Sequence, residues 1–386
     1  MKNVIKINKQ SVNIDPSKLF SRLLVLSERD GNIMSHFQYE LTPVPTSLFV
    51  DNTMRKANKA QLIQSLLGKN YQIVESQNIM TTDENVIDGG SVIRKISWPA
   101  RGTFKSIIES YRNYIKSTYG KSTIVFDGYR DQPSTKDQEH SRRYNNVCHK
   151  FNVKDETVLT VSQQSFLGNS SNKAGLIELM SPKLTADGHT VKQAVSDADT
   201  LIIGSVLEIA SEGKSVTVFC NDTDVIVMLL HHWHENLGKI LVRSDIPRKG
   251  YKARKQLDVG EAALLLKPDV KKLLPFIHAF GGCDTTSGVY DKGKLSILRL
   301  IEKSEEAQQI ARIFSNPEVS AEEIGNIGTK VFVLLYGGST NDSLPMLRYR
   351  GYMKMISSSG KLAPSKLPPT ERSAYFHSLH VWLQVD

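Results

Sequence analysis

Three short segments decide the fold of this 386-residue chain: NVIDGG at residues 85–90, STIVFDG at 122–128 and SVTVFCNDTD at 215–224. Each is an apolar, largely β-branched run that ends in aspartate, a pattern typical of a buried strand followed by a turn. Between the first two lies FKSIIESYRNYIKSTY at 104–119, whose apolar residues recur at helical spacing. This alternation of strand and helix predicts an α/β fold with a mostly parallel sheet sandwiched by helices.

The sequence on either side of this pattern differs from it. Residues 1–85 mix helical spacing with a proline-containing extended stretch, and we interpret them as an accessory N-terminal region. Residues 86–300 carry the strand–helix alternation and are expected to form the functional domain. Residues 301–386 have mainly helical spacing, interrupted by KLAPSKLPPT at 361–370, so we expect a helical C-terminal extension.

The composition is that of a globular intracellular protein. Three widely spaced cysteines without a CxxC motif argue against a disulfide framework and suit a reducing compartment. The N-terminus lacks the pattern of a signal peptide, and the longest apolar runs are far shorter than the ~20 residues of a membrane span. We therefore expect a protein of the nucleus or cytoplasm that is not secreted and has no membrane partner.

Positive charge is concentrated in one stretch of the chain. The net charge is +9, and residues 239–272 alone contain ten basic and four acidic residues. Such a patch favours a nucleic-acid partner, because each neutralised phosphate releases counterions. A solvated loop and helix face would explain it equally well. The residues that we expect to bind nucleic acid in this stretch are Lys249, Lys252, Arg254 and Lys255.

Aspartates follow the expected strands or begin the helices next to them. The carboxyl ends of parallel strands share one edge of the sheet, where α/β proteins bind their ligands. Clustered carboxylates repel unless cations lie between them, and oxygen ligands in this number suit Mg²⁺ or Mn²⁺. Two such ions ~3.5–4 Å apart are the arrangement that hydrolyses phosphodiesters. The candidate ligands are Asp88, Asp127, Asp197, Asp199, Asp222, Asp224 and Asp284.

Two other interpretations apply to these aspartates. Any single aspartate at the end of a strand can serve only as a turn residue or helix cap. The DxD of Asp222 and Asp224 also fits the haloacid-dehalogenase phosphatases, in which the first Asp is the nucleophile. That family usually carries its DxD on the first strand, whereas this one follows two other acidic strand ends.

Taken in order, VIDGG, VFDGY, the DAD at 197–199, NDTD and GGCDTTSGVYDKGK resemble the PIN-like nucleases of the flap endonuclease superfamily. The resemblance covers roughly residues 86–300 and implies a PIN-like nuclease domain in which all seven aspartates hold the two metal ions. The layout, down to LPPT followed by His377 and His380, also resembles a group of animal proteins that carry this nuclease-like core.

The resemblance also implies cationic residues above the metals. Lys136 and Arg143 follow VFDG and lie seven residues apart, so they would share one face if this stretch is helical. In the family, a Lys and an Arg at this spacing contact the scissile phosphate and stabilise its developing charge. Arg142 would take the role of the Arg if the register shifts by one residue. A solvated basic helix face is the alternative.

The segment GGCDTTSGVYDKGK resembles the start of the family's helix–turn–helix element, which grips duplex DNA through loop amides and lysines. Lys292 and Lys294 would then contact phosphates. The segment departs from the family pattern because GVYDKG, at residues 288–293, replaces a compact Gly–apolar–Gly turn. Asp197 is a second departure, since the family usually has Glu there.

Other potentially reactive residues give weaker signals. His231, His232 and His234 form an HHxH run, but surface histidines explain it better than a metal site. Cys220 and Cys283 lie in apolar or glycine-rich contexts, and we expect structural thiols there.

The sequence therefore predicts a Mg²⁺- or Mn²⁺-dependent nuclease with DNA, more than RNA, as its substrate. Two alternatives stay open at this point: a PIN-type ribonuclease, and a catalytically silent nucleic-acid-binding scaffold that retains the fold.

Overall fold

The computed structural model describes residues 3–7, 10–14, 18, 22, 25, 33–40, 42–68, 73–74, 81–99, 101–128, 149–195, 197–244, 254–359 and 363–385. The chain divides into two compact units. An α/β unit comprises Leu66–Leu266, and a helical unit combines Met1–Ser65 with Lys267–Asp386. This division differs from the three consecutive segments expected at 1–85, 86–300 and 301–386, because the N-terminal region and residues 267–300 pack with the C-terminal helices.

The α/β unit is built on a seven-stranded sheet of order β5-β11-β10-β9-β6-β7-β8. Five neighbouring strands, from β10 to β8, run parallel, whereas β11 pairs antiparallel with both β10 and β5. The strands are β5 (Ile73–Val74), β6 (Glu84–Asp88), β7 (Thr123–Phe126), β8 (Thr190–Gln193), β9 (Val216–Phe219), β10 (Ile240–Arg243) and β11 (Arg254–Asp258). The expected mostly parallel α/β sheet is confirmed.

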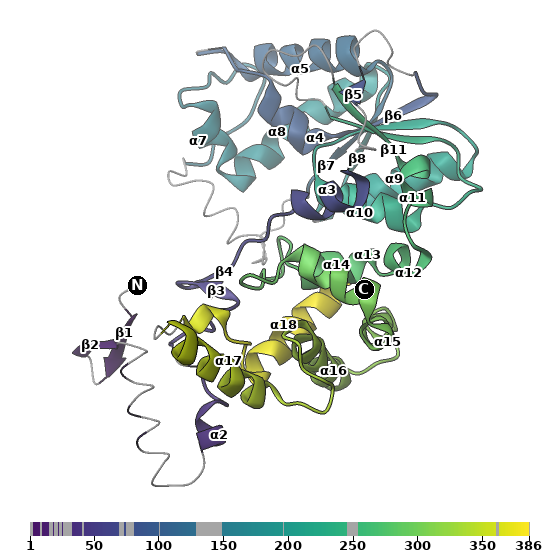
Figure 1. Cartoon of the computed structure of the whole chain (residues 1–386). Helices are drawn as coiled ribbons and strands as arrows, with labels where there is room; N and C mark the ends of the chain where they lie inside the picture. Colours follow the sequence, from purple (N-terminus) through teal and green to yellow (C-terminus); the bar gives the residue numbers. More distant parts are fainter. Residues whose placement is uncertain are drawn as a thin grey trace. The chain divides into compact units, whose positions relative to one another are not determined.

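Helices cover this sheet, as Figure 1 shows. They are α4 (Gly89–Lys95), α5 (Phe104–Tyr119), α7 (Gln163–Leu167), α8 (Ser170–Ala186), α9 (Ala198–Ser211), α10 (Thr223–His232) and α11 (Val259–Leu264). One face packs its alternate strand residues Ile87, Ile124 and Phe219 against α4, α5, α7 and α8 in a single apolar core. Helix α9 packs against β6, β7 and β9. Strands β7, β9 and β10 are buried at every position, as expected of parallel strands covered on both faces.

The crossover helix expected at 104–119 is helix α5, with the same bounds. Thr103 caps its N-terminus by accepting a hydrogen bond from the amide of Ser106. Its apolar residues at helical spacing, Phe104, Ile107, Ile108, Tyr111 and Ile115, are all buried. The helix ends at Gly120, whose φ of 60° is readily adopted only by glycine.

The helical unit contains two short hairpins and a set of helices. Its elements are β1 (Asn3–Ile7), β2 (Gln10–Ile14), α2 (Ile33–His36), β3 (Phe49–Val50), β4 (Thr53–Met54), α12 (Pro268–Lys272), α13 (Leu274–Phe280), α14 (Lys294–Lys303), α15 (Glu305–Ile313), α16 (Ala321–Leu335), α17 (Leu344–Ser359), the 3₁₀ turn η3 (Pro364–Lys366) and α18 (Glu371–Val385). Helix α3 (Ala60–Leu67) spans the boundary between the two units.

A buried arginine joins the N-terminal region to the C-terminal helices. Arg348 on α17 is 2% exposed, and it donates to the carbonyls of Tyr39 (3.0 Å) and Pro368. Its guanidinium also lies 3.6 Å from Glu40, which accepts from the Thr370 amide at 3.1 Å. A buried charge requires such partners. The LPPT segment at 367–370 therefore supplies backbone groups to this network.

The helical unit has an apolar core that encloses His377 of α18. This imidazole packs against the rings of Phe280 (5.0 Å between centroids) and Phe332 (5.3 Å). Its Nε2 lies 3.3 Å from the Phe280 carbonyl, so Nε2 carries the proton, and Nδ1, 3.1 Å from Ser287 Oγ, accepts. Burial lowers the pKa of His377 from 6.5 to about 4, so the imidazole is neutral at physiological pH.

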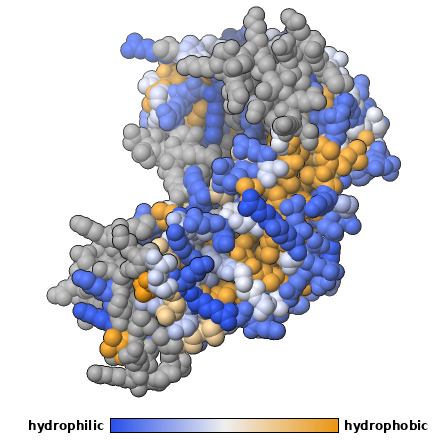
Figure 2. All heavy atoms as spheres, viewed as in Figure 1, coloured by the Kyte–Doolittle hydropathy of each residue, from blue (hydrophilic) through white to orange (hydrophobic). Residues whose placement is uncertain are grey.

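Among the residues that are coloured in Figure 2, hydrophilic ones predominate, and hydrophobic ones are exposed in patches. None of the helices in the described ranges is long and apolar enough to span a bilayer.

We predict that acid destabilises the helical unit through His377. Between pH 6.5 and pH 4 the unfolded chain binds a proton that the folded chain does not, so stability falls as the pH falls. The loss attributable to this group is roughly 3 kcal/mol across that range. Urea unfolding from pH 7 to pH 4 measures it. The variant His377→Gln should show a shallower pH slope, whereas His234→Gln, at an exposed position, should match the wild type. Equal slopes for all three proteins would contradict the assignment.

Candidate metal centre

The parallel register brings two aspartates to the same edge of the sheet. Asp88 is the last residue of β6 and pairs with Val125 of β7, so Asp127 follows two residues further along the neighbouring strand. On the other side of β6, Ile87 pairs with Phe219 at the end of β9, after which the chain reaches Asp222. All these aspartates therefore lie at the carboxyl edge of the sheet.

This edge contains the point where the strand order reverses. From β6 the chain moves outward to β7 and β8, and then returns through α9 to β9 on the opposite side of β6. Open α/β sheets bind their ligands beside such a switch point, which lies here between β6 and β9. Asp88 ends β6 and Asp222 follows β9, and these are the two strands on either side of the switch point.

The charges of four aspartates act on two neighbouring groups, the Asp88 carboxyl and the Cys220 thiol. Burial raises the pKa of Asp88 to about 6; the Ser91 amide opposes this rise, and the charges of Asp127 and Asp222 add to it. Burial and then the charges of Asp88, Asp222 and Asp199 raise the pKa of the Cys220 thiol. Cys220 is 2% exposed and is therefore a structural thiol beneath the carboxylates, as the sequence predicted.

Each of three carboxylates accepts a hydrogen bond at the start of a helix. Asp88 accepts from the Ser91 amide of α4 (3.0 Å), and Asp222 from the Asp224 amide of α10 (2.9 Å). Asp127 accepts from the Ala198 amide of α9 at 3.1 Å. Helix N-termini carry partial positive charge and exposed amides, so they stabilise these carboxylates in close proximity.

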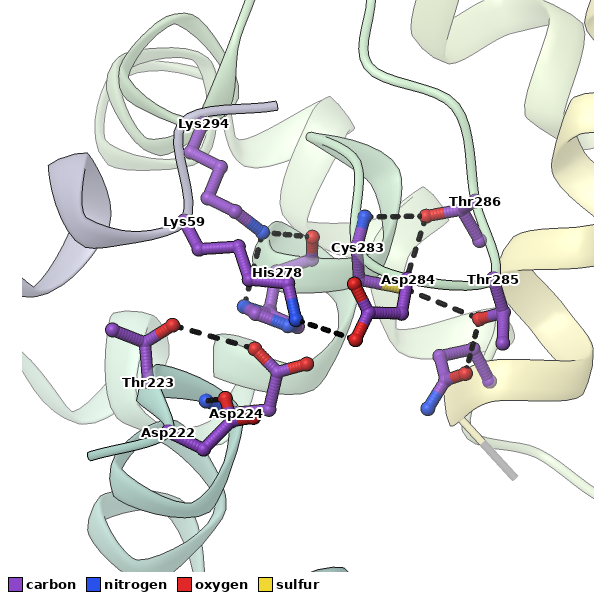
Figure 3. A network of polar contacts seen from close by, with 11 residues as sticks. Lys59, Asp222, Thr223, Asp224, His278, Cys283, Asp284, Thr285, Thr286 and Lys294 are labelled. Atoms are coloured by element: carbon purple, nitrogen blue, oxygen red, sulfur yellow. Dashed lines mark hydrogen bonds and ion pairs between the residues drawn. The ribbon is translucent and has the colours of Figure 1, made fainter. Parts of the chain in front are cut away.

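Asp197 and Asp224 lie at the N-termini of α9 and α10, the helices whose amides bind Asp127 and Asp222. Asp197 is the N-cap of α9 without a side-chain cap hydrogen bond, and Asp199 lies in the first turn. Asp224 lies in the first turn of α10, where its Oδ1 is 3.4 Å from the Thr223 hydroxyl (Figure 3). The six predicted ligands that belong to the α/β unit thus lie at the carboxyl edge of the sheet or in the helices that begin there.

Gly90 opens a small space between two of these carboxylates. A Cβ atom at this position would lie 3.1 Å from Asp127 Oδ2 and 3.2 Å from Asp88 Oδ1. Oxygens from two adjacent strands therefore face one point that carries no side chain. Gly128 has a different role, because a Cβ there would lie 2.3 Å from the Ala194 carbonyl oxygen. This close approach packs the chain after Asp127 against the chain before α9.

The donor set and the space at Gly90 fit a hard divalent cation. Within the described part of the chain, no three His, Cys, Asp or Glu side chains are already arranged to hold a metal ion. The carboxylates of Asp88, Asp127 and Asp222 each accept a hydrogen bond from the amide of a different helix.

Asp284, the seventh predicted ligand, belongs to the helical unit. Its Oδ2 lies 2.8 Å from the ammonium of Lys59, and both side chains are about one-quarter exposed (Figure 3). The carboxylate therefore already has a cationic partner within its own unit.

The structure corrects the expectation that Lys294 contacts phosphate. Lys294 is 1% exposed, and its ammonium donates to the His278 carbonyl at 2.6 Å and lies 3.0 Å from Nδ1 of the same residue (Figure 3). Because the Lys294 ammonium is buried, a phosphate cannot reach it. Lys292 lies over the ring of Tyr336, with 5.6 Å from its ammonium to the ring centroid.

The other predicted basic contacts are only partly placed. Lys136, Arg142, Arg143, Lys249 and Lys252 lie outside the described residues. Arg254 and Lys255 begin strand β11, and the structure describes their backbone alone.

Two further members of the basic stretch are engaged within the protein. Lys239 pairs with Asp258 at 3.0 Å, and buried Arg243 donates to Gln256 at 2.8 Å. Two of the ten basic residues of this stretch therefore already have partners within the protein.

The HHxH run shows no metal-holding arrangement among the residues that are described. His231 and His232 end α10, with their rings 4.7 Å apart, and His234 is exposed.

Comparison with solved structures finds junction-resolving enzymes. The first is a Holliday junction-resolving enzyme GEN1 in complex with product DNA and a Mg²⁺ ion, with 15% identity and a TM-score of 0.31 over 67% of this chain and 52% of that one. A eukaryotic junction-resolving enzyme GEN-1 with sodium gives 13% identity and a TM-score of 0.34 over 65% and 51% of the two chains. Its form with cesium gives 12% and 0.29 over 82% and 64%.

This chain thus spans about half the length of the first two of those enzymes. The sequence matches no protein-family model and no curated protein.

The roles of two residues, Gly90 and Lys59, could not be predicted from the sequence. Gly90 stands in the quoted VIDGG motif, but its role depends on a carboxylate from the next strand. Lys59 has no local signal, because its partner Asp284 lies far away in the sequence.

We predict that Gly90→Ala impairs cation binding without unfolding the protein. Gly90 is in helix α4, where Ala is favoured by up to ~1 kcal/mol, but the added methyl group would press on Asp88 and Asp127. Affinity for Mn²⁺, measured by calorimetry, should fall by roughly tenfold or more. The matched control is Gly204→Ala in α9, where a Cβ meets nothing within 4 Å. Equal Mn²⁺ affinities for the two variants would exclude a cation site at this point.

Proposed function

We propose that this protein is a metal-dependent nuclease that hydrolyses phosphodiester bonds, with DNA as its substrate in a flap or 5′ exo/endonuclease type of reaction. The observation that carries the proposal is the convergence of Asp88, Asp127, Asp199 and Asp222 at the switch point of a parallel sheet. A purely structural set of helix caps would not require mutually repelling carboxylates at one edge of the sheet.

The proposed ligands are six aspartates of the α/β unit: Asp88, Asp127, Asp197, Asp199, Asp222 and Asp224. When bound, two Mg²⁺ or Mn²⁺ ions would polarise the phosphodiester and make a water molecule sufficiently nucleophilic to attack it. The protein holds the carboxylates in place through the backbone: three helix starts fix their positions, and Gly90 keeps the space between Asp88 and Asp127 open. Hydrolysis joins the water oxygen to phosphorus, breaks one P–O ester bond and transfers a proton to the leaving oxygen.

Substrate binding is assigned to basic residues that the sequence places near these carboxylates. Lys136 and Arg143, or Arg142 in the shifted register, follow Asp127 and would neutralise the scissile phosphate. Lys249, Lys252, Arg254 and Lys255 would supply contacts to the nucleic-acid backbone. Lys292 remains a proposed contact, provided that its ammonium leaves the ring of Tyr336.

One observation favours the alternative of a silent nucleic-acid-binding scaffold. In the segment that resembles the duplex-gripping element, Lys294 is buried and the Gly288 amide donates to the Arg55 carbonyl at 2.7 Å. A protein that had lost its structure-specific substrate could retain the acidic edge and the fold. Metal-dependent cleavage separates this alternative from the proposed function.

We predict that Asp222→Asn and Asp224→Asn abolish cleavage but leave the fold intact. Asn retains N-cap ability, so α10 keeps its start, whereas a ligand charge is lost. Cleavage of labelled flap DNA, duplex DNA and single-stranded RNA, with Mg²⁺, Mn²⁺ or EDTA, should fall at least ~100-fold for either variant, and substrate binding should persist.

The matched control for this experiment is Asp258→Asn. Asp258 also ends a strand, caps a helix (α11) and pairs with Lys239, but it is not among the proposed ligands. This variant should cleave like the wild type, with some loss of stability. If the wild type binds nucleic acid, cleaves none of the substrates with either metal and behaves like both Asp222→Asn and Asp224→Asn, the protein is a scaffold.

A further inference from the structure

The glycine-rich loop at residues 281–293 of the helical unit is attached to the N-terminal segment at residues 46–59. The Gly288 amide donates to the Arg55 carbonyl at 2.7 Å, and the Tyr290 amide donates to the Ser47 carbonyl at 2.8 Å. The Arg55 guanidinium lies 4.8 Å from the centroid of the Tyr290 ring. Loop amides that would otherwise be free to contact phosphate are thus hydrogen-bonded within the chain.

Glycine makes this close packing possible. Gly282 has a φ of +99°, and a Cβ there would lie 2.6 Å from the Gly288 Cα and 2.9 Å from the Ala57 Cβ. A Cβ at Gly288 would lie 3.2 Å from the Ala57 amide nitrogen. The two glycines therefore let the loop fold back on itself beneath the N-terminal segment.

Lys59 completes the attachment with charge. Its ammonium lies 2.8 Å from Asp284 Oδ2, and the side chains are 26% and 29% exposed. Partial burial makes the attraction stronger than that of a fully solvated pair. A divalent cation that approached Asp284 would have to approach this ammonium as well, and like charges repel. Lys59 and a metal ion therefore compete for the same carboxylate.

We propose that Asp284 is paired with Lys59 instead of a metal ion, and that the glycine-rich loop binds the segment at 46–59 instead of nucleic acid. Asp284 is then a positioning residue that fixes this loop, and the metal ions are held by the aspartates of the α/β unit alone. The statement about metal rests on the proposed function, whereas the statement about the ion pair does not.

The test is a double-mutant cycle in the full-length protein with Lys59→Met, Asp284→Asn and the double variant. Each single variant should lower the melting temperature by roughly 2–4 °C, and the double variant by no more than the larger single loss, because both remove the same interaction. Lys59→Arg keeps the charge and should stay close to the wild type. The matched control is Asp291→Asn in the same loop, where the exposed residue has a φ of 54° that Asn tolerates.

Metal titration forms the second arm. Calorimetry with Mn²⁺ should give Asp284→Asn an affinity within about twofold of the wild type, whereas Asp222→Asn should lose roughly tenfold or more. Additive losses of melting temperature in the cycle, or equal losses of Mn²⁺ affinity in Asp284→Asn and Asp222→Asn, would overturn the inference. If the wild type binds no Mn²⁺, the proposed function fails, and the melting cycle alone decides whether Lys59 and Asp284 form the pair.

Discussion

The electrostatic repulsion among carboxylates at one edge of a parallel sheet is the constraint on which the α/β unit depends. The register of β6 with β7 and β9 brings Asp88, Asp127 and Asp222 to that edge, and burial raises the pKa of Asp88 to about 6. Helices α4, α9 and α10 begin at the same edge and present their amides to these carboxylates. The topology that creates the repulsion therefore also supplies part of its compensation, since the helix after a parallel strand begins where the strand ends.

The seven aspartates that the sequence predicted as ligands do not all have the same kind of partner. Asp88, Asp127 and Asp222 of the α/β unit each accept a hydrogen bond from the amide of a different helix, and oxygens of Asp88 and Asp127 also face the space at Gly90. In the helical unit, Asp284 and Glu40 have basic partners from the same unit, Lys59 and Arg348. The first arrangement suits a binding site and the second a fixed structure. This difference is why we assign the metal ions to the α/β unit alone.

Much of the α/β unit follows from local sequence patterns. The β-branched runs ending at Asp88 and Asp127 became β6 and β7, and helix α5 has the bounds that its apolar spacing predicted. Local patterns do not predict contacts between distant segments of the chain. The pairing of Lys59 with Asp284 and the packing of Arg348 on Glu40 join the N-terminal region to the C-terminal helices, so the compact units differ from the expected domains. The burial of Lys294 likewise depends on the fold of α13 and α14, which a charge pattern does not encode.

The central claim is that Asp88, Asp127 and Asp222 surround a cation. Anomalous diffraction from crystals soaked in Mn²⁺, recorded at the manganese absorption edge, tests it most directly. We expect a peak at the carboxyl edge of the sheet, in contact with carboxylate oxygens from β6 and from the chain that follows β7 and β9. At saturating Mn²⁺, no peak at this edge, with the carboxylates still hydrogen-bonded to the helix amides, would contradict it.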